Sequence, residues 1–383
     1  MKKIALIIFS EGLEYDDRVR KEVLSIQKLF PEICFKIFVL FDNGKNVAEE
    51  GITSYGVPYK SYKLITREVL KGGRFKYLKT IEFTLKVLPD IKKYDAIWCG
   101  EIATALFLKC VRRKPLLWDL HELPMLLLGS SLRRSFLRHL FSKCSVVLHA
   151  NQDRIEYLKS RGVIKNIDKH YALRNYPNFY DVDKEYDEKY YSFVEWKANK
   201  ECVYLQGLFA ERRAPFETIS AVLDTGSLAA VVVGSFDKDI LERLLTKYGE
   251  DEISNRIFFA GKIPQLKIPQ YVSKCSFSMV FYKHVNANNI YCEANRFYQS
   301  LLVGVPVICG NNPPMKRIIE EYGCGVCIND DGNSVDEIKI GIQTYFERKE
   351  TILKNVDENK NCFLWDSQNE IIKAFVKKYL KYE

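Results

Sequence analysis

Short apolar runs alternate with longer segments of helical periodicity along most of the chain. In the first half the runs that predict strands are Lys3–Phe9, Phe35–Phe41, Ala96–Cys99, Leu116–Leu120 and Ser145–Ala150. Between them, apolar positions recur at helical spacing in Asp17–Leu29 and Ala103–Arg112. Strands that alternate with helices in this way favour an α/β fold with a parallel, doubly wound sheet.

The alternation lapses between residues 175 and 200, where an acidic and aromatic stretch follows a turn at Asn175–Asn178. It then resumes and ends in an amphipathic helix over Ser367–Tyr382. The later strands are predicted at Cys202–Gln206, Ala229–Gly234, Arg256–Phe259, Phe277–Phe281, Pro306–Cys309 and Gly325–Ile328, and the helices at Pro215–Leu223, Lys238–Tyr248 and Asn295–Val303. We therefore predict a Rossmann-like domain over 1–180, a linker over 181–200, a second Rossmann-like domain over 201–365 and a C-terminal helix over 366–383.

Length and composition agree with two soluble domains. The chain has 383 residues, and 47% hydrophobic content is enough for two cores. No apolar run approaches the roughly 18 residues that span a bilayer. The eleven cysteines are scattered and odd in number, which predicts reduced thiols and a cytoplasmic protein. Cys324 and Cys327 have C-x-x-C spacing, but we interpret them as part of an apolar run, because no second pair lies at zinc-ligand spacing.

The positive charge is concentrated in the first half. Residues 1–190 carry a net charge of about +10 and the remainder about −1. Two stretches, Lys60–Lys79 and Leu123–Phe141, interleave basic residues with leucine, tyrosine and phenylalanine. They predict either a peripheral contact with an anionic membrane, at its inner face, or core helices with solvated cations. No RNA-binding module is recognisable, so we expect no nucleic-acid partner.

A dinucleotide-binding site is not indicated. The first strand-to-helix turn, Ser10–Asp17, contains one glycine, whereas the dinucleotide fingerprint needs three. Glu293–Ile308 is more informative: it predicts a loop, a helix that Gly304 ends, and a strand. We expect Asn295 to cap this helix, Arg296 to bind a phosphate at its N-terminus and Gln299 to bond a ribose hydroxyl. The same pattern also fits an ordinary α/β unit.

Glu293–Ile308 resembles the donor-site signature of GT-B glycosyltransferases, especially family 4. Further resemblances follow in the family's order and cover nearly the whole chain: Asp17–Glu22, Trp118–Leu123, Arg174–Pro177, Gly207–Arg213, Phe259–Gly261 and Phe363–Trp365. The resemblance implies two Rossmann-like domains facing a central cleft, with the C-terminal helix crossing back to the first domain.

The resemblance also implies roles for individual residues. The donor or nucleotide site would contain Arg213 or its neighbour Arg212, together with Gly261, Glu293, Asn295, Arg296 and Gln299. The catalytic residues would be His121, Glu122 and Asp17. His121 would contact the donor sugar or share a proton. Such enzymes work mainly by electrostatic stabilisation of the leaving diphosphate, so we expect neither a metal nor another cofactor.

The chain departs from the family pattern at four positions. Tyr291 and Gln299 stand where family 4 has two glutamates, and Leu208 and Ala214 replace an arginine and a glycine. The leading hypothesis is a retaining transferase that uses a UDP- or GDP-sugar and a glycan or lipid-linked acceptor in bacterial surface polysaccharide or glycoconjugate synthesis. The alternatives are a non-catalytic GT-B-like partner protein and a GT-B nucleotide-sugar epimerase.

Overall fold

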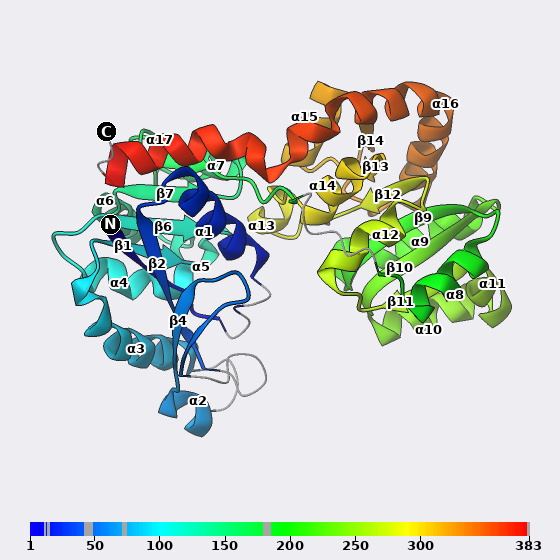
Figure 1. Cartoon of the computed structure of the whole chain (residues 1–383). Helices are drawn as coiled ribbons and strands as arrows, with labels where there is room; N and C mark the ends of the chain where they lie inside the picture. Colours follow the sequence, from blue (N-terminus) through cyan, green and yellow to red (C-terminus); the bar gives the residue numbers. More distant parts are fainter. Residues whose placement is uncertain (11–12, 14–15, 42–48, 71–74, 179–184, 381–383) are drawn as a thin grey trace. The chain divides into compact units, whose positions relative to one another are not determined.

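The chain forms two compact units in a computed structural model that describes all residues except 11–12, 14–15, 42–48, 71–74, 179–184 and 381–383. The first unit comprises residues 1–175 together with 368–383, and the second comprises 176–367. Figure 1 shows a sheet with helices around it in each unit. Both units are therefore α/β, as the alternation predicts.

The first unit contains an eight-stranded sheet in the order β3-β4-β2-β1-β5-β6-β7-β8. Every pairing is parallel except that of β3 with β4. The central strands β1, β5 and β6 are almost continuously buried, as expected where helices cover both faces. The strands are β1 (Lys2–Ile7), β2 (Ile33–Leu40), β3 (Glu50–Ile52), β4 (Pro58–Tyr62), β5 (Ala96–Gly100), β6 (Leu116–Leu120), β7 (Val146–His149) and β8 (His170–Ala172).

The described α-helices of this unit include the last helix of the chain, α17. Its Phe375 is fully buried and makes ring contacts with Trp98 of β5 and Tyr171 of β8. The crossing of the C-terminal helix back to the first unit is thus confirmed. The helices are α1 (Asp17–Leu29), α2 (Ile65–Val69), α3 (Lys76–Val87), α4 (Ala105–Cys110), α5 (Met125–Leu128), α6 (Ser131–Lys143), α7 (Gln152–Ser160) and α17 (Asn369–Leu380).

The second unit contains a six-stranded parallel sheet in the order β11-β10-β9-β12-β13-β14. Numbered from its first strand, the order is 3-2-1-4-5-6, which is the Rossmann arrangement. The strands are β9 (Glu201–Phe209), β10 (Leu228–Phe236), β11 (Ile257–Gly261), β12 (Phe277–Val280), β13 (Val307–Cys309) and β14 (Gly325–Cys327). The helices are α8 (Glu188–Lys197), α9 (Pro215–Asp224), α10 (Lys238–Tyr248), α11 (Glu250–Arg256), α12 (Ile268–Val272), α13 (Ala287–Ile290), α14 (Asn295–Leu302), α15 (Pro313–Tyr322) and α16 (Val335–Asn359).

Gly304 ends α14 as the sequence predicts. Its φ of 83° lies in the left-handed region, where a glycine has no Cβ to clash. The amide of Gly304 donates to the carbonyl of Leu301, and that of Val305 to Ser300, which is the Schellman arrangement. The chain is thereby turned into β13.

Two local predictions are wrong. The segment predicted as a linker, 181–200, contains α8, whose Tyr190 and Phe193 are buried in the core of the second unit; its residues 181–184 lie outside the described part. Asn295 is not the cap of α14: Ala294 holds that position without a side-chain hydrogen bond, and Asn295 is exposed. Residues 188–197 fold as a helix because their aromatic side chains pack into the core in spite of the polar composition of the segment. Asn295 is not the cap because α14 begins at Asn295 itself, one residue earlier than a cap at this position implies.

None of the helices in the described ranges is long and apolar enough to cross a membrane.

Candidate functional site

Each sheet has one place where its strand order reverses. In the first sheet this switch lies between β1 and β5, and in the second between β9 and β12. In open α/β sheets, ligands bind outside the carboxyl ends of the strands at such a switch point. The polar side chains that follow these four strands are therefore the candidates for function.

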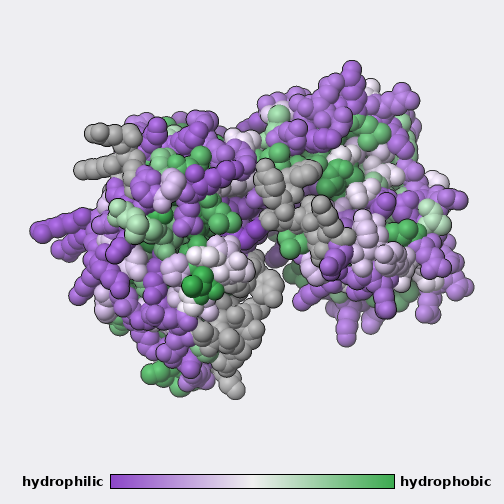
Figure 2. All heavy atoms as spheres, viewed as in Figure 1, coloured by the Kyte–Doolittle hydropathy of each residue, from purple (hydrophilic) through white to green (hydrophobic). Residues whose placement is uncertain are grey.

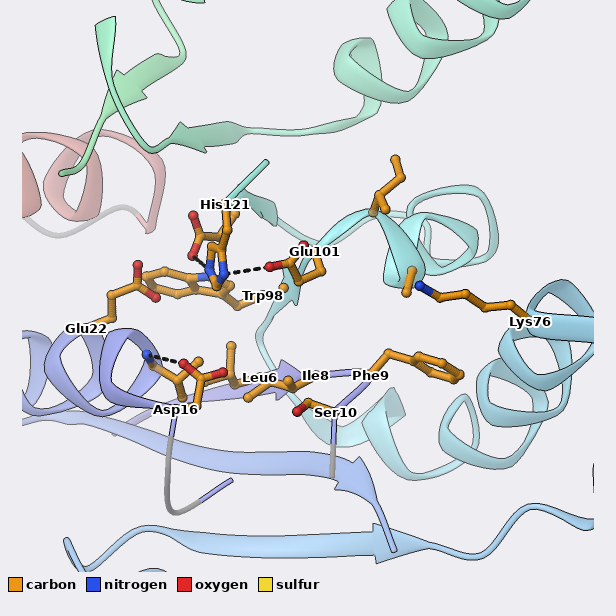
Figure 3. A pocket seen from close by; sticks show the side chains of 15 residues that line it. Leu6, Ile8, Phe9, Ser10, Asp16, Glu22, Lys76, Trp98, Glu101 and His121 are labelled. Atoms are coloured by element: carbon orange, nitrogen blue, oxygen red, sulfur yellow. Dashed lines mark hydrogen bonds and ion pairs between the residues drawn. The ribbon is translucent and has the colours of Figure 1, made fainter. Parts of the chain in front are cut away.

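The first unit has a cavity of about 300 Å³ at its switch point. Asp16, Glu101 and His121 line it from the ends of β1, β5 and β6, and Glu22 reaches it from α1 (Figure 3). Lys76 enters from α3 on another side. Titratable side chains thus line one part of the cavity, and apolar ones such as Leu6, Phe9 and Trp98 line the rest.

A buried ion pair forms the floor of this cluster. Arg18, which is 4% exposed, donates through Nε and Nη2 to both carboxylate oxygens of Asp119, at 3.0 and 2.8 Å. Its Nη1 donates to the carbonyl of Leu173 at 2.8 Å. Burial opposes ionisation of Asp119, but Arg18 and His121 outweigh it and hold its pKa well below the usual range. Asp119 is therefore a fixed anion beneath the cavity.

His121 is held between two carboxylates. Its Nε2 donates to Asp119 and its Nδ1 to Glu101, each at 2.7 Å. Burial by itself would lower the pKa of His121, but the charge of Asp119 and both hydrogen bonds outweigh it and raise this pKa well above its usual value. The side chain is therefore an imidazolium. A cation with both nitrogens donating can bind a negative group but cannot accept a proton.

Burial raises the pKa of two further carboxyls that line the cavity. Burial, followed by the charge of Asp119, raises the pKa of Glu22 well above its usual value. Burial also raises the pKa of Asp16, whose carboxylate caps α1 by accepting from the amide of Val19. Oε1 of Glu22 also lies 3.0 Å from Nε of Arg18, so Glu22 and Asp119 share this guanidinium.

Glu101 has a strained backbone. Its φ is 67° although it is not a glycine, and such conformations cost on the order of 1–3 kcal/mol. The surroundings impose it: its amide donates to the carbonyl of Asp119, and its carbonyl accepts from Nε1 of Trp118 and from Thr104. The strain aims the carboxylate at His121.

The second unit gathers two guanidinium groups at its switch point. Arg213 follows β9 and Arg296 lies in the first turn of α14. Their Cζ atoms lie 5.2 and 4.9 Å from the ring centroid of Tyr282, which follows β12. Both approach Gly207 so closely that a Cβ there would lie 2.0 Å from Nη1 of Arg213 and 3.0 Å from Nη1 of Arg296.

This pair of cations is not neutralised. Within the described ranges neither arginine forms an ion pair with a carboxylate, and Nε of each is buried without a hydrogen-bond partner. Burial, together with the charge of Arg296, lowers the pKa of Arg213. Two uncompensated positive charges at a helix N-terminus form a site for a doubly charged anion.

The other residues predicted for the donor site are Arg212, Glu293, Gln299, Gly261 and Asn295. Arg212 is exposed, so Arg213 is the arginine that points inward. Glu293 accepts from the hydroxyl of Tyr298 at 2.5 Å. Gln299 is half-buried, and its Oε1 has no hydrogen-bond partner in the described structure. Gly261 ends β11 with φ 65°, beside the amine of Lys189. Asn295, the remaining one, is exposed.

Two predicted catalytic residues do not line the cavity. Glu122 is exposed, and Asp17, the first residue of α1, pairs with Arg20 and with buried Lys21 at 2.7 Å. Glu101 in the first-unit cavity and Tyr282 beside the two arginines were not predicted from the sequence. Glu101 directly follows β5 and Tyr282 lies two residues after β12, each a strand beside a switch point. Their positions could be recognised only once the strand order was known.

Comparison with known proteins supports the fold. No protein-family model and no curated protein matches the chain. Among solved structures, sucrose-phosphate synthase from Thermosynechococcus elongatus is similar over 100% of both chains, with 15% identity and a TM-score of 0.76. Anabaena HepE in complex with UDP and glucose covers 98% of this chain and 99% of its own at 16% identity, with a TM-score of 0.70. A glycosyltransferase from Rickettsia africae covers 100% and 99% at 13% identity, with a TM-score of 0.71. The chain thus has the GT-B fold along its whole length.

Proposed function

We propose that this protein is a glycosyltransferase that moves a sugar from a nucleotide-diphosphate donor, UDP- or GDP-linked, to a hydroxyl-bearing acceptor. The observation that carries the proposal is the pair of uncompensated guanidiniums, of half-buried Arg213 and buried Arg296, at the switch point of the second sheet. A departing nucleoside diphosphate carries about two to three negative charges near neutral pH, and such an anion would neutralise this pair of cations. Anabaena HepE, which shares the fold, has been crystallised with UDP.

The two arginines would supply the positive charge that stabilises the leaving diphosphate, and we propose that no metal is required. Transfer should then persist in a chelator; an absolute metal requirement would contradict the proposal. Retention of the anomeric configuration is a further part of the proposal, supported by the sequence resemblance to family 4. Proton NMR of the product's anomeric centre tests it.

The first-unit cavity would bind the hydroxyl-rich part of a substrate. Its carboxyl groups, Glu101 and Glu22, are hydrogen-bonding partners for hydroxyl groups, while His121, whose pKa is raised well above its usual value, provides a positive charge. Because His121 is held protonated between Asp119 and Glu101, we propose that it orients substrate or stabilises negative charge and does not act as the base.

A lipid-linked or glycan acceptor, in bacterial surface-glycan assembly, is the finer part of the proposal. Figure 2 shows hydrophobic side chains gathered at the end of the first unit that α2 forms. Ile65 and Val69 of α2 are 65% and 72% exposed, and Arg67 lies between them in the sequence. Leu126 and Leu132 of the second predicted stretch are 82% and 80% exposed. Residues 71–74 of Lys60–Lys79 lie outside the described part.

Co-sedimentation with anionic phospholipid vesicles tests the membrane contact. Ile65→Glu with Val69→Glu should abolish binding, because it removes the inserted apolar surface. Ile340→Glu, at a site 53% exposed on the second unit, should not. Equal binding by all three proteins would refute a contact through α2.

A thermal-shift panel of UDP, GDP, CMP and NAD tests the proposed function. Stabilisation by one nucleoside diphosphate and transfer from the matching nucleotide sugar are expected. The absence of stabilisation by any nucleotide would count against an enzyme and for the non-catalytic alternative. Release of free sugar without a glycoside product would point to the epimerase or hydrolase side.

A further inference from the structure

Cys309 and Cys327 lie opposite each other on neighbouring strands. The parallel register of β13 and β14 pairs them directly, so their side chains lie on the same face of the sheet. Neighbouring strands are about 4.8 Å apart, which falls within the Cα separation that a disulfide bridges. Cys324, the other member of the C-x-x-C spacing, lies before β14 and directs its sulfur toward the carbonyl of Ile318. The fold therefore pairs Cys327 with a distant cysteine and not with its sequence neighbour.

The two thiols differ in access. Cys309 is fully buried, whereas Cys327 is half-buried and lines a cavity of about 490 Å³ between β14, α15 and α16. This cavity is polar at its rim, where two basic and two acidic side chains lie. They are Lys316, Arg348, Glu320 and Glu337. A small polar oxidant can thus reach Cys327 but not Cys309.

The two thiols also differ in reactivity. A hydrogen bond from Cys309, aided by the charge of Lys316 and opposed by burial and Glu320, lowers the pKa of the Cys327 thiol. The same hydrogen bond and burial raise the pKa of Cys309 well above its usual value. A thiolate is the nucleophile in thiol chemistry. Cys327 is therefore suited to react first and Cys309 to follow.

We propose that Cys327 and Cys309 form a peroxide-sensitive dithiol that closes to a disulfide across β13 and β14. The Cys327 thiolate attacks one oxygen of hydrogen peroxide, the O–O bond breaks, and with one proton taken up the products are a sulfenic acid and water. The Cys309 sulfur then attacks the Cys327 sulfur, its proton leaves with the hydroxyl as a second water, and the S–S bond forms. Two thiols are oxidised and one peroxide is reduced.

The dithiol is connected to the cation pair of the second unit. Sγ of Cys327 contacts the carbonyl of Gly310 at 3.5 Å. Two residues further along the chain, Asn312 is fully buried and donates a hydrogen bond to the carbonyl of Tyr282 at 3.2 Å. The ring of Tyr282 makes cation–π contacts with the guanidinium groups of Arg213 and Arg296. Forming the S–S bond takes the Cys327 sulfur away from the carbonyl of Gly310, so we expect oxidation to disturb the segment from Gly310 to Asn312 and to weaken nucleotide binding. This consequence rests on the proposed function.

Peptide mapping of the whole protein tests the dithiol. The reduced protein is treated with hydrogen peroxide, remaining thiols are alkylated, and trypsin is added. Cleavage at Lys316 and Arg317 separates peptide 297–316, with Cys309, from peptide 318–339, with Cys324 and Cys327. The expected product is a disulfide-linked pair of these peptides. The link should persist in Cys324→Ala and be lost in Cys327→Ala.

Other cysteines serve as internal controls. Cys110 and Cys362 are exposed, and Cys275 is a buried thiol whose sulfur contacts Cys202. Cys327 should be alkylated several-fold faster than Cys110 and Cys362 at neutral pH in the reduced protein. Three outcomes would overturn the proposal. The first is a disulfide between Cys324 and Cys327, and the second is a Cys309–Cys327 disulfide that forms only after the Cys202–Cys275 pair has oxidised. The third is alkylation of Cys327 that is no faster than alkylation of Cys110. Fragmentation of the linked peptides between Cys324 and Cys327 decides this on the unmodified chain even where a variant fails to fold.

The nucleotide shift separates the two ideas. Either UDP or GDP should raise the melting temperature of the reduced protein, and the same nucleotide should raise it less in the oxidised protein. If neither UDP nor GDP has an effect on the reduced protein, the proposed function fails while the mapped disulfide stands. If the disulfide forms and the nucleotide shift is unchanged, the link through Asn312 to Tyr282 is refuted.

Discussion

Replacing Arg213 by methionine should make the free protein more stable and at the same time unable to bind the nucleotide-sugar donor that we propose. Arg213 and Arg296 are two positive charges at the switch point of the second sheet, with no carboxylate partner among the described residues. Methionine keeps most of the apolar length of arginine and removes the charge. The repulsion disappears, and with it the site for the diphosphate.

The magnitude follows from the contacts at Gly207. Because one point lies 2.0 Å from Nη1 of Arg213 and 3.0 Å from Nη1 of Arg296, these nitrogens are at most 5.0 Å apart, the sum of the two distances. Two unit charges about 5 Å apart repel by about 3 kcal/mol at an effective dielectric constant of about 20. Loss of the cation–π contact with Tyr282 offsets about 0.5–1 kcal/mol. Delocalisation of the guanidinium charge reduces the repulsion further, so a net gain of about 1–2 kcal/mol is expected.

Differential scanning fluorimetry with and without UDP measures both effects. A gain of about 1 kcal/mol raises the melting temperature of a domain this size by about 2–4 °C, so Arg213→Met should melt about 2–8 °C higher without ligand. UDP should stabilise the wild type and leave the variant unchanged. The matched control is Arg212→Met, at an exposed position one residue away, which should change stability by less than about 0.5 kcal/mol and keep the UDP shift.

Two outcomes would refute this reasoning. A lower melting temperature of Arg213→Met in the absence of ligand would mean that the arginine has a stabilising partner that outweighs the repulsion. A full UDP shift in the variant would mean that the diphosphate binds elsewhere. High salt provides a further check: it should narrow the difference between the two free proteins, because it screens part of the repulsion.

Three other predictions follow from single positions. Gly207→Ala should destabilise by more than about 2 kcal/mol in urea unfolding and abolish the UDP shift, because its Cβ would overlap Arg213 at a φ of 135°. Gly226→Ala is the control, because Gly226 has φ 80° and no atom near its added Cβ, so this variant measures the cost of backbone strain alone. An equal fall in the free energy of unfolding for both variants would exclude a steric overlap with Arg213. Glu101→Gln should lower the pKa of His121 in an NMR titration of the imidazole, because a carboxylate partner is lost. An unchanged pKa would show that Glu101 does not interact with His121. The raised pKa of His121 adds stability that is fully present below about pH 6.5 and is lost as pH rises through the higher folded pKa. His121→Gln should therefore show a smaller alkaline decline in its free energy of unfolding, and parallel curves would contradict a protonated His121.

Much of the architecture could be predicted from the sequence because apolar periodicity is a local property. The helices at Asp17–Leu29 and Lys238–Tyr248 and the strand at Leu116–Leu120 begin and end where the pattern places them. Apolar periodicity did not predict the helix over 188–197, whose burial depends on aromatic side chains within a polar segment. The segment 188–197 looked like a linker because of its charges, yet its aromatic side chains form a core with Tyr271 and Phe258.

The candidate site was only partly visible in the sequence. Arg213 and Arg296 could be named because each belongs to a recognisable segment, and the structure places them on the ring of Tyr282. Glu101 follows an ordinary strand with no motif around it, so nothing local marked it. Cys309 is the last residue of a predicted strand and Cys327 was interpreted together with Cys324 as part of an apolar run, so nothing in the sequence paired Cys309 with Cys327.

The sequence by itself determined the two α/β halves, the glycine that ends α14 and the presence of arginines after β9 and at α14, because propensity, periodicity and end signals act within a few residues. Only the tertiary structure decided which strand lies beside which. That order brings Glu101 and Asp119 onto the two nitrogens of His121, packs two arginines against one tyrosine and sets Cys309 beside Cys327. The physical reason is that charge state, repulsion and thiol reactivity depend on distances of a few ångströms between residues far apart in the chain.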